Sequence, residues 1–148
     1  MERKDLYDEA TFEVMCSRID NLTDNTQPEW GSMTVAQMLA HCAEVQDVAN
    51  GKDLKGTPFI FKLMSGMIKK MVISDKPYPK NSRTHAQYVM TEPEDFDRQK
   101  DRLLHSLKFM RVLGRKESQH PLFGKWTAEE KSWAMYKHLD HHLTQFGV

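Results

Sequence analysis

The last part of the chain contains a histidine-rich segment, YKHLDHHLTQF, whose residue types and spacing suit metal binding. His138 and His142 are four residues apart, so on a helix both imidazoles lie on one face about one turn apart. Relative to His138, His142 lies about 40° around the helix, and the apolar side chains lie at about 60° to 160°. The pair is therefore predicted to border the core, close enough to share one metal ion.

A third histidine, His41, is predicted to point inward from another helix. It falls within an apolar arc of the segment that follows Thr34, together with Met38, Val45 and Val48. Three protein nitrogens with one open position are the pattern of a catalytic rather than a structural metal site. On spacing and burial alone, a metal site and three independent core histidines remain open as alternatives. Imidazole ligands suit zinc, nickel and ferrous iron, and the sequence does not choose among these divalent ions.

Two more histidines near the end of the chain are weighed against simpler roles. His120 precedes Pro121 in a loop that leads into the last helix, and loops at the mouth of a helical protein often carry function. It is the candidate catalytic residue, as acid, base or substrate contact, with an ordinary loop histidine as the alternative. His141 lies about 60° from His138 on the side away from the apolar arc, which predicts a solvated or supporting side chain.

The remaining reactive side chains are predicted to be structural. His105 falls opposite an apolar stripe and is predicted to lie on the surface, and His85 lies in a crossover with no partner that the sequence indicates. Cys42 follows His41 but falls in the middle of its apolar arc, where a cysteine usually behaves as a small buried hydrophobe. The sequence therefore predicts no cysteine nucleophile and no bound organic cofactor.

Four amphipathic segments are predicted to position the three candidate ligands. The second begins with a capping box at Thr34 and Gln37, and the last begins with another at Thr127 and Glu130. In chain order, the segments run from about Tyr7 to Leu22, from Thr34 to Asn50, from Glu92-Pro93-Glu94 to Gly114, and from Thr127 to about Phe146.

Between the second and third segments lies a longer crossover, Gly51 to Tyr88, with a short amphipathic helix predicted over Phe59 to Ile73. The stretch that follows it, SDKPYPKNSRTH, is rich in turn formers. The methionines of the crossover are predicted to fill the core, with the lining of an apolar pocket as the alternative. We therefore predict an all-α fold, a four-helix bundle with a longer crossover containing a short helix.

Composition narrows the class of protein further. The 148 residues suit a single domain spanning 1–148. With 21 basic and 21 acidic residues, the chain has no net charge to attract nucleic acid or an anionic membrane. The two cysteines lack CxxC spacing and the amino terminus is polar, so we expect a cytoplasmic protein. The one long apolar stretch, Pro58 to Ile73, is interrupted by lysines and falls short of a membrane span.

Two motifs resemble those of the DinB-like superfamily. WGSMTVAQMLAH, which ends at His41, is similar to the Trp-to-His stretch of that superfamily, and HLDHHLTQ resembles its H-x-x-H-H-x-x-Q signature. The ending HPLFGKWTAEEKSWAMYKHLDHHLTQFGV further resembles an uncharacterised branch. The resemblance implies a four-helix bundle in which His41, His138 and His142 bind a divalent metal. Better-known relatives include transferases and isomerases that act through low-molecular-weight thiols.

The sequence departs from the superfamily pattern at two places beside these residues. Relatives often have glutamate four residues before the first histidine, where this chain has Gln37. They often read Arg-Gly after the last histidine, where this chain has Leu143-Thr144. The expected function is a metal-dependent enzyme that activates a water or thiol for hydrolysis or thiol transfer on a small molecule. The two departures favour the alternative, a non-catalytic bundle that binds a small ligand or forms a homodimer around a vestigial metal site.

Overall fold

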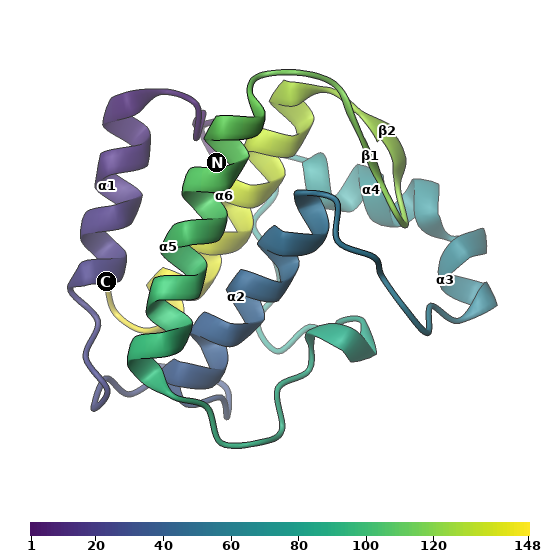
Figure 1. Ribbon diagram of the computed structural model, residues 1–148. Helices are drawn as coiled ribbons and strands as arrows, with labels where there is room; N and C mark the ends of the chain where they lie inside the picture. The colour runs from purple at the N-terminus through teal and green to yellow at the C-terminus, as the bar shows by residue number, and fades with distance from the viewer.

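The computed structural model describes residues 1–148 and shows a mostly helical protein (Figure 1). The elements in chain order are α1 (Glu9–Asp20), α2 (Val35–Ala49), α3 (Phe59–Leu63), α4 (Ser65–Ile73), the 3-10 turn η1 (Ala86–Tyr88), α5 (Phe96–Leu113), β1 (Ser118–His120), β2 (Gly124–Trp126) and α6 (Ala128–Gln145). None of the helices combines the length and the apolar character that a membrane span requires.

The two helices that carry the candidate ligands begin as predicted. At the start of α2, Gln37 N–H donates to the Thr34 hydroxyl at 3.2 Å, and Thr34 N–H donates to Oε1 of Gln37 at 3.0 Å. Thr127 and Glu130 form the same reciprocal pair at the start of α6. Both capping boxes are confirmed, and they set the register of His41, His138 and His142.

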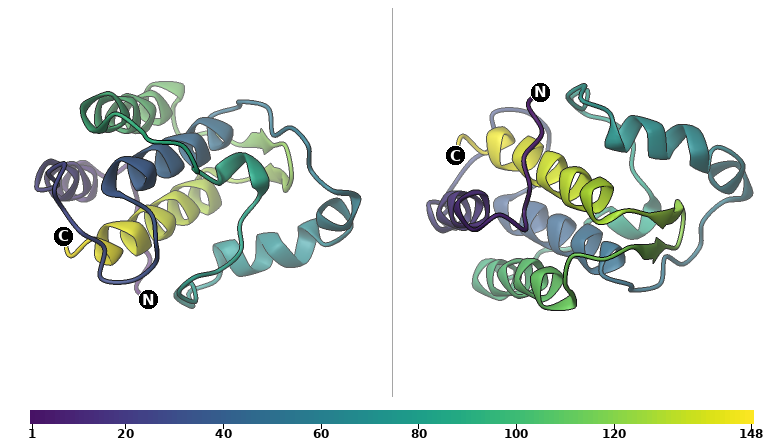
Figure 2. Two further views of the ribbon diagram at one scale, coloured as in Figure 1. Left: turned by 90° about the horizontal axis from the view of Figure 1, so that it is seen from below. Right: turned by 90° about the horizontal axis from the view of Figure 1, so that it is seen from above.

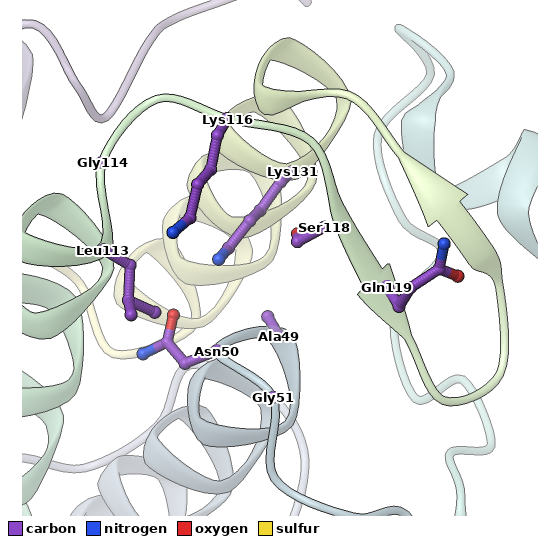
Figure 3. A pocket seen from close by; sticks show the side chains of 9 residues that line it. All are labelled: Ala49, Asn50, Gly51, Leu113, Gly114, Lys116, Ser118, Gln119 and Lys131. Atoms are coloured by element: carbon purple, nitrogen blue, oxygen red, sulfur yellow. The ribbon is translucent and has the colours of Figure 1, made fainter.

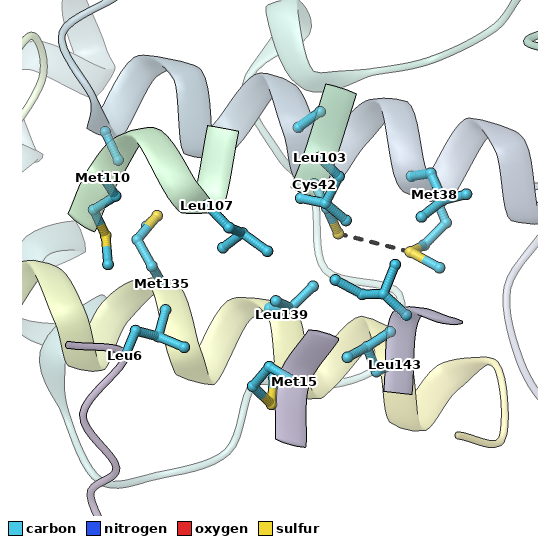
Figure 4. Close-up of a cluster of buried hydrophobic side chains, with 14 of the residues drawn as sticks. Leu6, Met15, Met38, Cys42, Leu103, Leu107, Met110, Met135, Leu139 and Leu143 are labelled. Atoms are coloured by element: carbon cyan, nitrogen blue, oxygen red, sulfur yellow. Dashed lines mark hydrogen bonds between the residues drawn. The ribbon is translucent and has the colours of Figure 1, made fainter. Parts of the chain in front are cut away.

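The four longer helices enclose one apolar core. In the end-on views of Figure 2, α1, α2, α5 and α6 lie around a common centre, and α3 and α4 lie to one side. Figure 4 shows the side chains of these helices interleaving in the core. The fully buried members include Met15, Ile19, Met38, Leu39, Leu103, Leu107, Met110 and Leu143.

The crossover differs from its prediction. Instead of one helix, α3 and α4 meet at Met64, just before Ser65 and Gly66, whose helix propensity is weak. Most of their large apolar side chains are exposed, including all three methionines, and Met67 keeps 59% of its surface accessible, whereas Val72 packs against the core. The interpretation of the crossover methionines as core filler is therefore wrong. The end of α4 is held to α6 by Lys137, whose ammonium donates to the carbonyls of Met71, Ser74 and Lys76.

A small antiparallel hairpin occupies the segment predicted as a loop before the last helix. Ser118 pairs with Trp126 and His120 with Gly124, so the fold is mostly helical with a two-stranded sheet, and all-α is imprecise. Strands of three residues are too short to show alternating hydrophobicity, which is why the sequence pattern missed them. The third long helix also starts later than predicted, at Phe96, because Asp95 accepts from Arg98 N–H as its cap.

Candidate metal centre

Three histidines from two helices come together between α2 and α6. The side-chain nitrogens that His41, His138 and His142 offer as ligands all lie within 4.8 Å of one another. The Nε2 atoms of His41 and His138 are 3.0 Å apart. His138 and His142 share a helix face, as their spacing predicts, and His41 joins them because α2 packs against α6. The three predicted ligands therefore form one group.

The ring of His41 is oriented by a backbone carbonyl. Its Nδ1 lies 2.7 Å from the carbonyl oxygen of Tyr88. A carbonyl can only accept a hydrogen bond, so Nδ1 carries the proton and donates it. A neutral imidazole then has its lone pair on Nε2, the atom that faces His138.

The ring of His142 is oriented by Gln145. The amide nitrogen of Gln145 donates to the Trp30 carbonyl at 2.7 Å, which leaves Oε1 of Gln145 facing His142. Oε1 accepts from Nδ1 of His142 at 2.8 Å. His142 is thereby held in the Nδ1–H tautomer, with its Nε2 lone pair available to the group. Two of the three rings thus have fixed tautomers, the arrangement typical of metal-binding histidines.

Gly31 makes room for the Gln145 side chain. Gly31 has φ +86°, and a Cβ at this position would lie 2.6 Å from Nε2 of Gln145. A side chain here would strain the backbone and displace the amide. Trp30 therefore contributes the carbonyl that accepts from Gln145, and Gly31 leaves the space for its side chain. Both features place Gln145 against His142.

The carbonyl that orients His41 is itself held in place by the crossover. Gln87, in the same 3-10 turn as Tyr88, donates to the buried carboxylate of Glu44 at 2.8 Å. Gln87 N–H donates to Nδ1 of His85, and Nε2 of His85 lies 3.1 Å from the Thr57 hydroxyl. His85, to which the sequence assigned no role, is buried and caps this turn. The bond to Gln87 is local, whereas the contact with Thr57, 28 residues away, depends on the fold of the crossover.

Burial keeps all three clustered histidines neutral near pH 7. Desolvation, followed by the charge of His41, lowers the pKa of His142 to about 3. Burial likewise lowers the pKa of His138, with His142 as the next cause, and that of His41 despite the opposing bond to Tyr88. His41 is 5% exposed and His142 9%, whereas His138 is partly exposed. Neutral imidazole is the form that binds a metal ion.

The donor set fits a divalent transition metal. Two nitrogens on one ion, each about 2.0–2.1 Å from it, are separated by about 2.9–3.4 Å for angles between 90° and tetrahedral. The 3.0 Å between the Nε2 atoms of His41 and His138 falls in this range, and the nitrogen of His142 lies within 4.8 Å of both. The three residues could therefore hold a metal ion, with His41 and His142 already presenting lone pairs.

His141 and His120 lie outside this group of three. The ring of His141 contacts the Trp30 ring at 5.9 Å and the Tyr78 ring at 5.8 Å, between centroids. His120 is buried in the hairpin, where its ring stacks on Phe123 at 4.2 Å. Its Nδ1 accepts from two backbone N–H groups of the hairpin turn, and burial lowers its pKa to about 4. The structure therefore gives His120 a packing role and does not place it with the three histidines.

Three neighbours of the ligands also have structural roles. Gln37 is engaged in the capping box and donates to the Glu92 carbonyl at 3.1 Å. Leu143 is fully buried in the core. Cys42 is 2% exposed, and burial raises the pKa of its thiol, as the prediction of a buried hydrophobe requires. His105 is exposed and stacks on Phe109, so its predicted surface position is confirmed.

Fold and site define a mostly helical protein with a buried group of three histidines that could bind a metal ion. The chain belongs to the family described as "Protein of unknown function (DUF1569)", whose sequence model matches residues 1–147. No curated protein and no solved structure matches the chain. The family description states no activity, so the function is inferred from the chemistry of the site.

Proposed function

We propose that this protein is a metal-dependent enzyme of the DinB-like kind, in which His41, His138 and His142 hold one divalent ion. The observation that carries the proposal is the orientation of His41 and His142. Tyr88 and Gln145 hold the Nδ1 protons of these rings, so their Nε2 lone pairs are directed to the group. Core histidines kept only for packing have no need for two fixed tautomers whose lone pairs converge.

The arrangement of helices supports the same proposal. The four longer helices share one core and the crossover lies to one side, as expected for a four-helix bundle of the DinB-like type (Figure 2). His41 ends the Trp-to-His motif on α2, and the other two ligands begin and end the His-x-x-His-His motif on α6.

The chemistry follows from the charge of the donor set. A divalent ion held by three neutral imidazoles would keep its full charge and would lower the pKa of a bound water or thiol. The buried surroundings keep the imidazoles neutral, and Tyr88 and Gln145 orient two of them. We infer hydrolysis or thiol transfer on a small substrate, with a low-molecular-weight thiol as the second reactant in the transfer reaction.

Metal content tests the first step. Protein purified without a metal-affinity column is expected to contain one zinc, nickel or iron per chain, measured by mass spectrometry of the elements. His41→Ala and His142→Ala should lose the metal, whereas His105→Ala, which removes an exposed histidine, should retain it. A wild-type protein that contains no metal and takes up none would refute the proposal.

Activity assays then separate the two reactions. The metal-loaded protein is incubated with activated esters, and separately with a low-molecular-weight thiol and an electrophile. Turnover that disappears in His142→Ala and persists in His105→Ala supports the enzyme. A metal-loaded protein inert toward both panels would instead support a binding protein.

One observation favours the second candidate function, a dimerising bundle. The crossover helices expose a run of apolar side chains, with Phe59 78% and Leu63 71% accessible, and exposed apolar patches often mark protein interfaces. If this surface joins two copies, light scattering will give twice the mass of the chain, and Leu63→Glu will restore a monomer. A monomeric wild type at high protein concentration would exclude the second candidate.

A further inference from the structure

A cavity lies at the other end of the α2–α6 contact, separate from the histidines. Its volume is about 140 Å³, and its walls come from the ends of α2 and α5, from β1 and from α6. Figure 3 shows the side chains of Lys116 and Lys131 extending toward the same space. Lys131 precedes His138 by seven residues, or about 10 Å along the helix axis. The cavity contains none of the three candidate metal ligands.

Lys131 is buried without a partner. The residue is 3% exposed, and its ammonium, which opens into the cavity, makes no hydrogen bond and no ion pair with another group of the protein. Lys137, six residues further along α6, shows the contrasting case. Its equally buried ammonium donates to three backbone carbonyls. The ammonium of Lys137 thus has three acceptors in the protein, whereas the ammonium of Lys131 has none and points into a cavity.

No negative group of the protein faces this cavity. None of its lining residues is acidic, and Lys116 adds a second unpaired ammonium. The carboxylates of the adjoining segments are occupied elsewhere, Glu117 by Lys125 and Glu129 by Arg115. Burial and then the charge of Lys116 lower the pKa of Lys131 to about 8, as expected for an ammonium without a counter-charge.

A hydroxyl supplies a further donor. Ser118 Oγ accepts from the Trp126 indole N–H at 2.9 Å, which leaves the hydroxyl proton of Ser118 free. Ser118 and both lysines line the same cavity. Two ammoniums and a hydroxyl are the donors that a small multiply charged oxyanion requires.

We propose that this cavity binds a small doubly charged oxyanion of the phosphate or sulfate type, held by Lys131, Lys116 and Ser118. The carboxyl-terminal ends of α2 and α5 carry partial negative charge, which favours the two lysines at this place. This attraction does not explain why Lys131 donates to none of the carbonyls. An oxyanion satisfies both ammoniums at once. The site would recognise a free anion or the phosphate group of a small metabolite.

Thermal unfolding with inorganic phosphate tests the proposal. At pH 7 and low-millimolar concentration, phosphate is expected to raise the Tm of the wild type above its value in chloride of equal ionic strength, because a ligand of the folded state stabilises it. Sulfate should act similarly and acetate more weakly. Lys131→Met, which keeps the length of the side chain and removes its charge, should abolish the excess shift.

Two further variants keep the test independent of folding. Lys116→Met changes an exposed side chain and should reduce the phosphate shift, whereas Lys108→Met, an exposed lysine outside the cavity, should leave it unchanged. Isothermal titration with phosphate gives the stoichiometry, expected to be one per chain. The proposal would be overturned if the wild type shows no excess shift, or if Lys116→Met and Lys131→Met both show the same shift as the wild type.

Discussion

Replacement of Gln145 by leucine tests how the site is built. Gln145→Leu keeps most of the side-chain volume and removes the acceptor for Nδ1–H of His142, which lies 2.8 Å away. It also removes the donor to the Trp30 carbonyl at 2.7 Å. The first bond is buried and the second partly buried, both lie beside one candidate ligand, and neither change removes a ligand.

The expected magnitudes follow from these two bonds. An unsatisfied buried Nδ1–H costs about 1–3 kcal/mol, and the lost bond to Trp30 costs about 0.5–1.5 kcal/mol. The free energy of unfolding of the metal-free protein should therefore fall by about 2–4 kcal/mol. Loss of a group that orients a metal-binding histidine typically weakens metal affinity about 10–100-fold, or about 1.4–2.8 kcal/mol.

The assay is a competition titration of zinc between the protein and a chromogenic chelator, with denaturant unfolding of the metal-free protein alongside. Gln145→Glu is the matched control, because its carboxylate still accepts from His142 while the donor to Trp30 is lost. Gln145→Glu should destabilise the metal-free fold and retain zinc affinity, whereas Gln145→Leu should lose both. Nitrogen NMR of the metal-free wild type should show His142 as the Nδ1–H tautomer.

Two results would refute this reasoning. If Gln145→Leu binds zinc within twofold of the wild type, the orientation of His142 does not depend on Gln145. If the NMR spectrum shows the Nε2–H tautomer of His142 in the wild type, its lone pair does not face the group.

Three further predictions follow from other contacts. Gly31→Ala should lower both stability and zinc affinity because its Cβ would meet Gln145 at 2.6 Å, whereas Gly56→Ala, with φ +67° and nothing within 4 Å, should lower stability alone, by about 1 kcal/mol. His120 stays neutral in the folded protein down to pH about 4, whereas the same side chain is protonated below about pH 6.5 in the unfolded chain. The free energy of unfolding should therefore decrease by up to about 3 kcal/mol as the pH falls from about 6.5 to 4. His120→Asn, which keeps an acceptor near Nδ1, should reduce that slope in denaturant unfolding measured across the same pH range. Lys137→Met should lower the free energy of unfolding by about 2–4 kcal/mol, measured by urea denaturation, because three carbonyls at the end of α4 lose a charged donor.

The helices and their inward faces could be predicted because the rules that govern them are local. A capping box needs only residues three apart, and an apolar arc needs only the helical period. Thr34, Thr127 and the face shared by His138 and His142 follow directly from these rules. The same rules failed for the hairpin at 118–126, where each strand is three residues long.

The groups that orient the ligands could not be predicted, because they depend on contacts between distant segments. The Tyr88 carbonyl reaches His41 across 47 residues, and Gln145 reaches Trp30 across 115. Gln145 ends the segment HLDHHLTQ, but its sequence position does not show that it fixes a tautomer. Similarly, Lys131 and Lys137 read as ordinary polar residues of a helix, and only packing shows that one is satisfied and the other is not.

The sequence by itself therefore determined which residues could bind a metal: two histidines one turn apart and a third on an apolar face. Only the tertiary structure decided whether the three meet and which nitrogens they present. Both depend on the packing of α2 against α6, on the Tyr88 carbonyl of the crossover and on the Gln145 amide, which the Trp30 carbonyl holds in place. Spacing along one helix is set by its geometry, whereas the direction of a lone pair is set by the hydrogen bond on the opposite side of the ring.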